Sequence, residues 1–278
     1  MNFFLYFLNV TCSAGQSALG KQYSRLGGAS LPFNVNRAAI GTVLFLVFAL
    51  INGFSLHIPT ALFGLCYGVS LCVSMHSGFK ALSIGPMSLT SIIASFSLII
   101  PFLFGIAFWN EEYTWLKTVG ILLLLASILL INAKREKGVS IKWFLYAMAT
   151  LITNGICSII QKMHQLEFPS LYQNEFMFWA LLCVLGVLLV SYAFKEHKTQ
   201  KLKFSFLGIL SGTANCVANY VVLYLSATED ASVLFPVVSI LKIIAVWAIG
   251  MVFFKEKLKL LQVIGLITGV ASVVILKI

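Results

Sequence analysis

The stretch Asn9-Val10-Thr11-Cys12-Ser13-Ala14-Gly15-Gln16 decides the fold, because it recurs 145 residues later as Asn154-Gly155-Ile156-Cys157-Ser158-Ile159-Ile160-Gln161. Further positions repeat at the same offset: Gly105, Phe108, Glu111, Gly120, Ala126 and Ser127 return as Gly250, Phe253, Glu256, Gly265, Ala271 and Ser272. The chain is therefore a duplicated unit of about 140 residues. We predict a first repeat over residues 1–137 and a second over residues 138–278.

The composition indicates a protein that lies in a lipid bilayer. Hydrophobic residues make up 60% of the chain and charged residues only 10%, against roughly 45–50% and 25% in soluble domains. The mean hydropathy is +0.97. We expect a multi-pass protein of the plasma or inner membrane. The net charge of +10 resides in short connectors, not on one helix face, which excludes a nucleic-acid partner.

Ten apolar segments are long enough to span the hydrocarbon core as helices. Their predicted ranges are 2–20, 33–51, 58–78, 87–109, 114–132, 142–161, 172–194, 204–225, 232–254 and 258–277. The predicted fold class is an all-α integral membrane protein with five spans in each repeat. An odd number of spans makes the second repeat run through the membrane inverted relative to the first.

Basic residues are distributed unevenly between the two sides that ten spans define. One side carries Lys21, Arg25, Arg37, Lys80, Lys134, Arg135, Lys137, Lys142, Lys195, Lys198, Lys201, Lys203, Lys255, Lys257 and Lys259. The other side carries Lys117, Lys162 and Lys277. The positive-inside rule assigns the first side to the cytoplasm, so both termini would face outward.

Two polar stripes are the best candidates for a substrate site. Asn9, Ser13 and Gln16 share one helix face at i, i+4 and i+7, and Asn154, Ser158 and Gln161 repeat the pattern. Amides offer both donors and acceptors to a polar ligand. The alternative is that they form interhelical hydrogen bonds, worth about 1 kcal/mol or less each.

Other polar residues in the predicted spans add to this site. Asn215, Asn219 and Tyr220 lie in the eighth span, and His76 lies in the third, where it could couple protons to transport or serve as a hydrogen-bond partner. Lys242 falls near mid-membrane. A charge there costs roughly 2.5–3.5 kcal/mol. It therefore either anchors a carboxylate or phosphate, or snorkels or bonds a carbonyl.

Four further residues are candidates for gating. Pro101 and Pro236 interrupt the fourth and ninth spans, where a proline removes a backbone hydrogen bond. Arg37 and Glu175 open the second spans of the two repeats with opposite charges. They could form gate contacts or be solvated helix-end charges. Glycines at every fourth position, Gly64 with Gly68 and Gly208 with Gly212, predict close helix packing.

No metal or cofactor is expected. The six cysteines stand singly in apolar segments without a closely spaced C-x-x-C pair. The acidic residues all lie in connectors or at span ends. This argues against a proton-driven exporter of lipophilic cations, which needs a buried carboxylate. An enzyme is disfavoured, because no nucleophile–base pair appears at the membrane surface.

The end of each repeat resembles the drug/metabolite transporter superfamily, specifically its ten-helix EamA-like branch. The residues that carry the resemblance are 81–86, Pro101, 108–112 and 120–127, with 253–257 and 265–272 in the second repeat. The resemblance implies a bundle in which spans 1, 3, 4, 6, 8 and 9 surround a central cavity. It also implies transport of amino acids, other small metabolites, sugars or drugs, and cytoplasmic termini.

The chain departs from the small multidrug relatives in one respect. Those relatives carry a first-helix glutamate, and residues 9–16 contain none. We therefore expect a carrier for a small polar metabolite, an amino acid or related zwitterion or anion, that works by alternating access. A multidrug exporter and a non-transporting scaffold are the alternatives. Its partners would be lipid and a small-molecule substrate, and a monomer would suffice, because a duplicated unit forms its own pseudo-dimer.

Overall fold

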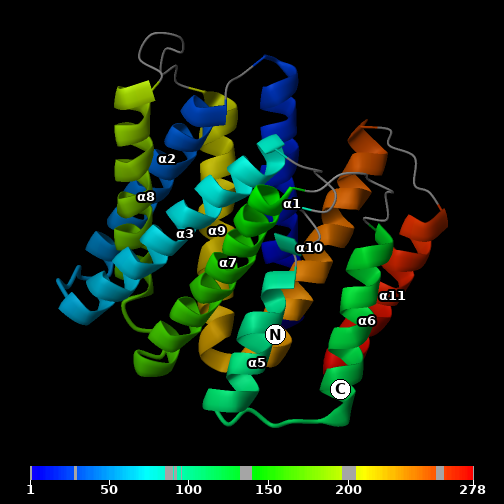
Figure 1. Ribbon diagram of the computed structural model, residues 1–278. Coiled ribbons are helices and arrows are strands. Elements are labelled where there is room, and N and C mark those ends of the chain that lie inside the picture. Colours follow the sequence, from blue (N-terminus) through cyan, green and yellow to red (C-terminus); the bar gives the residue numbers. More distant parts are fainter. Residues whose placement is uncertain are drawn as a thin grey trace. The chain divides into compact units, whose positions relative to one another are not determined.

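The computed structural model describes residues 2–27, 30–84, 90, 93–94, 96–131, 140–195, 205–254 and 260–277. The regular elements of this part of the chain are all helices (Figure 1). Its elements are α1 (Asn2–Arg25), α2 (Ser30–Ile51), α3 (Ile58–Ile84), η1 (Phe96–Leu98), α5 (Ile99–Phe108), α6 (Trp115–Ile131), α7 (Ile141–Glu167), α8 (Gln173–Lys195), α9 (Phe206–Thr228), α10 (Ala231–Phe254) and α11 (Leu260–Lys277). The predicted fold class is confirmed, with one helix for each predicted span. For the fourth span these are η1 and α5, and residues 87–89, 91–92 and 95 of that span lie outside the described residues.

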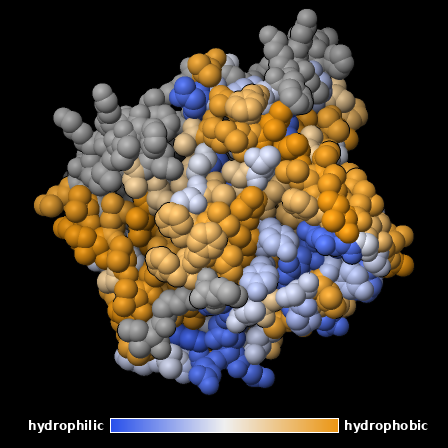
Figure 2. Space-filling model, turned by 180° about the vertical axis from the view of Figure 1, so that it is seen from behind, coloured by the Kyte–Doolittle hydropathy of each residue, from blue (hydrophilic) through white to orange (hydrophobic). Residues whose placement is uncertain are grey.

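Five of these helices are long and apolar enough to cross a membrane: α2, α3, α7, α8 and α9. The described residues also contain four shorter apolar helices, Phe96–Phe108, Trp115–Leu130, Ala231–Ala245 and Val263–Leu276. Helices dominate because every backbone polar group within lipid must be satisfied inside its own segment. Hydrophobic side chains cover most of the face in Figure 2, and hydrophilic ones gather toward its lower end.

The chain forms two compact units, each built from both halves of the sequence. Unit 1 contains Met1–Val69 and Met163–Ala227, and unit 2 contains Ser70–Lys162 and Thr228–Ile278. The two units therefore do not coincide with the predicted repeats, whose boundary at residues 137 and 138 stays a prediction.

In unit 1, α2 packs along α8, its counterpart in the second repeat (Figure 1). Two glycine pairs bring further helices close to these two. A Cβ at Gly64 would lie 2.7 Å from the Phe176 carbonyl oxygen of α8, and one at Gly68 would lie 2.7 Å from that of Ala180. The equivalent glycines of α9, Gly208 and Gly212, press in the same way on residues 33–40 of α2. Close packing through these glycines is confirmed.

In unit 2, α6 packs along α11, and α10 packs against α5, so counterparts from the two repeats again lie together. The Ser127 hydroxyl of α6 donates to the Gly265 carbonyl oxygen of α11 at 2.5 Å. A Cβ at Gly120 of α6 would lie 2.7 Å from the Leu276 side chain of α11. Small residues therefore set the distance between these two helices.

Candidate functional site

A line of polar groups along α9 in unit 1 is the first candidate site. Asn215 Oδ1 accepts a hydrogen bond of 2.8 Å from Arg37 Nη2 of α2. The carbonyl oxygen of Ala218, less than one turn further along α9, accepts from Asn9 Nδ2 of α1 at 2.7 Å. Ser211 lies one turn before Asn215, so residues 211, 215 and 218 share a face at i, i+4 and i+7. We call Asn9, Arg37, Ser211 and Asn215 the α9 polar line.

Two atoms of the α9 polar line are buried and have no hydrogen-bond partner in the described part of the chain. They are Asn9 Oδ1 and Ser211 Oγ, which belong to residues that are 1% and 0% exposed. A buried polar group without a partner costs roughly 1–3 kcal/mol. Both atoms therefore have unused hydrogen-bonding capacity.

The structure places Arg37 well inside a span and not at its very start. The structure begins α2 at Ser30, earlier than the predicted residue 33, and Leu31–Ile51 qualifies as a span. Arg37 therefore lies six residues, or about 9 Å at 1.5 Å per residue, from the start of that span. Its side chain contacts a neutral amide and forms no ion pair with any described residue. A charge at this depth is by default a candidate for function.

The remaining predicted site residues of unit 1 lie on α1, α9 and α8. Ser13 is buried in α1 and Gln16 is partly exposed. Asn219 Nδ2 donates to the Asn215 carbonyl oxygen within α9 at 2.8 Å, and Tyr220 is 43% exposed. Glu175, in the first turn of α8, is only 7% exposed, so it is not a solvated helix-end charge.

Seven predicted residues belong to unit 2, among them Gln161, which is buried and whose Nε2 has no partner in the described part of the chain. The Asn154 Oδ1 atom of α7 accepts from the Ser74 hydroxyl of α3 at 2.6 Å. Asn154 thus joins two helices, as its counterpart Asn9 does. Oδ1 of Asn154 and Nδ2 of Asn9 therefore serve as interhelical hydrogen-bonding groups. The Ser158 hydroxyl donates within α7 at 3.4 Å. The others are His76 and Lys242, which are exposed, and Pro101 and Pro236, which are buried. A symmetric site formed by the two stripes stays a prediction.

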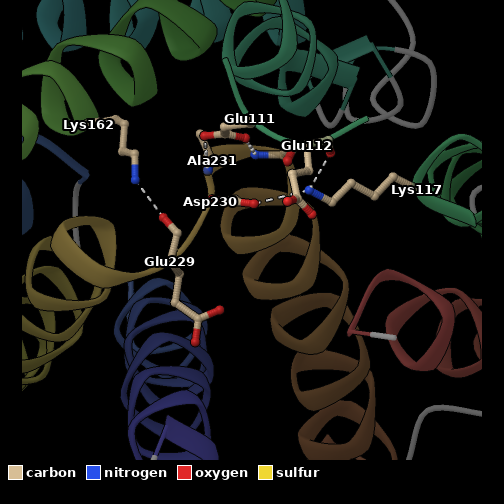
Figure 3. Close-up of polar contacts among 8 residues, drawn as sticks. Glu111, Glu112, Lys117, Lys162, Glu229, Asp230 and Ala231 are labelled. Carbon is tan, nitrogen blue, oxygen red and sulfur yellow. Dashed lines mark hydrogen bonds and ion pairs between the residues drawn. The ribbon is translucent and has the colours of Figure 1, made fainter. Parts of the chain in front are cut away.

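A second polar cluster surrounds the first turn of α10 in unit 2 (Figure 3). The Glu111 carboxylate accepts from the backbone N–H groups of Ala231 and Ser232 at 2.7 and 2.9 Å. Lys117 pairs with Asp230 at 3.1 Å, and Lys162 Nζ donates to the Glu229 carbonyl oxygen at 2.6 Å. A cavity of about 460 Å³ is lined by Glu112, Thr114, Lys117, Thr228, Glu229, Asp230, Val233, Ile275 and Leu276.

Sequence reasoning missed this cluster because its members are connector residues far apart in the chain. The signal was the recurrence of Glu111 as Glu256 at the end of each repeat. A carboxylate is stabilised at a helix N-terminus by the free N–H groups and the helix dipole. In the described residues no group of three His, Cys, Asp or Glu side chains could hold a metal ion, and all six cysteines are free thiols.

A histidine network in unit 1 was also missed. The Thr60 hydroxyl bridges His57 Nδ1 at 2.9 Å and His164 Nε2 at 3.1 Å. Gln165 Oε1 accepts from Gln173 Nε2 at 2.8 Å, which leaves Gln165 Nε2 to donate to His164 Nδ1 at 2.9 Å. The network therefore assigns the proton of neutral His164 to Nε2, facing Thr60.

Replacing Thr60 with valine is expected to lower the free energy of unfolding by about 1–3 kcal/mol, because the buried His164 N–H loses its acceptor. Thermal unfolding in detergent measures the change. Thr153→Val is the control, since the Thr153 hydroxyl donates to carbonyl oxygens of its own helix. Equal effects of the two substitutions would contradict the assigned bridge.

Comparison with known proteins places this helical architecture in a family. No curated protein matches the chain. A solved structure described as "Crystal structure of protein" is similar with a TM-score of 0.80 and 15% identity, over 99% of this chain and 95% of that one. At that identity the likeness shows the fold. The sequence model of the EamA-like transporter family matches residues 2–133 and again residues 141–278. The chain therefore belongs to the EamA-like transporter family.

Proposed function

We propose that this membrane transporter carries a small polar metabolite with a carboxylate group, an amino acid or a related zwitterion or anion. The observation that carries the proposal is the Arg37 guanidinium, which lies within a span and is bound to the neutral Asn215 amide at 2.8 Å. A guanidinium has five N–H donors in a planar fork that matches a carboxylate. Because its described partner is uncharged, its positive charge is available to an anionic group.

The unpaired atoms of the α9 polar line support a zwitterion in particular. Asn9 Oδ1 can only accept a hydrogen bond, and it is buried without a partner among the described residues. The attachment points of Arg37 and Asn9 on α9 are three residues apart, or about 4.5 Å along the helix axis. That spacing suits a ligand with an ammonium group close to its carboxylate. Ser211 would bind a further polar atom.

We extend the proposed site to polar residues on the equivalent helices of the two repeats. Alternating access in duplicated transporters uses equivalent elements of both repeats around one substrate site. The residues we propose as further lining are Ser13, Gln16, His76, Asn154, Ser158, Asn219 and Tyr220. Pro101 and Pro236 would allow the helices that carry them to bend, and Glu175 would act in gating. We place the carrier in the plasma or inner membrane.

Counterflow tests the proposed function. Proteoliposomes are preloaded with a metabolite mixture, and exchange with external isotope-labelled solutes is read by mass spectrometry. We expect carboxylate-bearing solutes to exchange at least about tenfold faster than uncharged solutes of the same size, since a site built to bind a charged group rejects an analogue that leaves it unpaired. Liposomes without protein serve as the control.

The opposite selectivity would overturn the proposal. Selective exchange of lipophilic cations would favour the multidrug exporter. Equal exchange rates for carboxylates and their amides would show that no cationic group of the protein recognises the substrate. Comparing an α-amino acid with the same acid lacking its amine tests the role of Asn9 separately.

A further inference from the structure

The turn between α9 and α10 is tied to three other elements of unit 2. Glu111 from the α5–α6 connector binds the start of α10, Lys117 of α6 pairs with Asp230, and Lys162 of α7 donates to the Glu229 carbonyl oxygen (Figure 3). We propose that the first turn of α10 is a gate element, held closed by the Glu111 carboxylate and hinged at Pro236. The gate rests on the proposed function for its role in transport, and its movement can be measured without a substrate.

The Glu111 carboxylate is the strongest of the three ties. Each of its oxygens accepts one N–H of the first turn of α10, from Ala231 at 2.7 Å and from Ser232 at 2.9 Å. Charge-assisted hydrogen bonds of this kind are about twice as strong as neutral ones. They satisfy two of the four N–H groups that the start of a helix leaves without an internal partner. Removing the carboxylate therefore releases this turn in particular.

Gly105 of α5 leaves the space that the Glu111 carboxylate occupies. A Cβ at Gly105 would lie 2.5 Å from Glu111 Oε2 and 2.7 Å from Cδ, so the carboxylate occupies the space that any other residue would fill. The Glu111 backbone N–H also donates to the Gly105 carbonyl oxygen at 3.3 Å. The connector is thus folded back on α5 with the side chain directed at α10. The Glu111 carboxylate is thus already positioned to bind the first turn of α10, and the connector does not have to change its conformation.

Pro236 separates this turn from the rest of α10. Proline has no N–H, so the Ser232 carbonyl oxygen receives no hydrogen bond from the residue four positions later. The Ser232 hydroxyl is also buried and without a partner among the described residues. Residues 231–235 are therefore joined to the later turns by a weakened hydrogen-bond ladder. Residues 231–235 are bound by Glu111 at one end and separated by Pro236 from the following turns at the other, so they can move as a unit.

The ties next to the cavity can open readily. The Asp230 side chain is 50% exposed and that of Lys117 is 12% exposed, at a distance of 3.1 Å, and solvent contact at the carboxylate weakens such a pair. Both residues line the 460 Å³ cavity, together with Glu112 and Glu229. Water in this cavity could take over their hydrogen bonds when the turn moves. Opening must therefore break the Glu111 hydrogen bonds and the bond of the buried Lys162 to the Glu229 carbonyl oxygen.

Cysteine accessibility tests the gate. Ser232, which is 0% exposed, is replaced by cysteine in a variant whose six native cysteines are alanine, and a membrane-impermeant maleimide is the probe. We expect Glu111→Gln to raise the labelling rate about tenfold, the equivalent of about 1.4 kcal/mol. Glu112→Gln is the matched control, because the side chain of the neighbouring carboxylate is exposed, and it should leave labelling unchanged.

Hydrogen exchange in the native-cysteine protein gives a second measurement. Glu111→Gln should speed exchange in residues 229–235 about tenfold and leave the other helices unchanged, whereas a purely structural role would speed exchange throughout unit 2. Pro236→Ala restores the missing N–H, so it should slow both this exchange and the turnover of the carboxylate identified by counterflow, without lowering the unfolding temperature.

The outcomes separate the gate from the transport proposal. Unchanged labelling and unchanged local exchange in Glu111→Gln would overturn the gate, as would a Pro236→Ala carrier that keeps the wild-type rate. A protein that shows the expected labelling and local exchange but exchanges no solute would count against the proposed substrate and leave the mobile turn established.

Discussion

Replacing Arg37 with methionine is expected to reduce carboxylate exchange about 100-fold or more. Methionine keeps much of the length of the arginine stem and removes the charged fork that binds Asn215 and, in our proposal, the substrate. Losing one partner of a buried charged contact typically costs 2–5 kcal/mol, and 100-fold corresponds to about 2.7 kcal/mol. Counterflow in proteoliposomes measures the loss.

Companion variants separate binding from folding. Arg37→Lys keeps the charge without the planar fork, so exchange should fall only about tenfold. Asn215→Asp gives the guanidinium an internal carboxylate, so exchange should fall as far as in Arg37→Met while the unfolding temperature is maintained. Near-normal exchange in Asn215→Asp would contradict an anion site at Arg37.

Lys242→Ala distinguishes the two cations that are candidates for the substrate anchor, Arg37 and Lys242. Lys242 is exposed on α10, whereas Arg37 contacts a buried amide. If Arg37 is the anchor, Lys242→Ala should change exchange less than threefold, within the range of ordinary surface substitutions. Loss of exchange in Lys242→Ala with normal exchange in Arg37→Met would assign the anchor to the ninth span.

The helices could be predicted from the sequence because lipid imposes one simple requirement. An apolar run of about 20 residues has no alternative to a helix in a bilayer, and the predicted spans are confirmed to within a few residues at most ends. The close packing at the glycine pairs could be predicted for a related reason, because glycines at every fourth position lie on one helix face and let a second helix approach closely. The duplication also anticipated that equivalent helices such as α2 and α8 would resemble one another.

The candidate sites were harder to predict because they depend on helix ends and distant pairs. The sequence put Arg37 near the start of the second predicted span, and a helix start three residues earlier places it deeper in that span. Its partner Asn215 lies 178 positions away, and Ala231 lies 120 positions from Glu111. No local pattern encodes such pairs. The burial of Asn9 Oδ1 without a partner is likewise a property of the packed structure.

Replacing Gly68 with alanine is expected to destabilise the protein by about 2 kcal/mol or more, measured as thermal unfolding in detergent. The new Cβ would lie 2.7 Å from the Ala180 carbonyl oxygen and 2.7 Å from the Cys183 Cβ of α8. A backbone oxygen cannot rotate away as a side chain can, so α3 and α8 must separate. Overpacking of this kind typically costs 1–3 kcal/mol.

Gly186→Ala on α8 is the matched control for Gly68→Ala. Among the described residues no atom beyond those of the adjoining helix turns lies within 4 Å of a Cβ built at Gly186, so alanine there should gain up to about 1 kcal/mol from its higher helix propensity. The same substitution thus has opposite effects at the two sites, because one glycine permits a helix contact and the other does not. If both variants unfolded at the same temperature, contact through Gly68 would not stabilise unit 1. The double variant Gly64→Ala with Gly68→Ala should then be equally mild, whereas the observed contacts predict that it loses the fold.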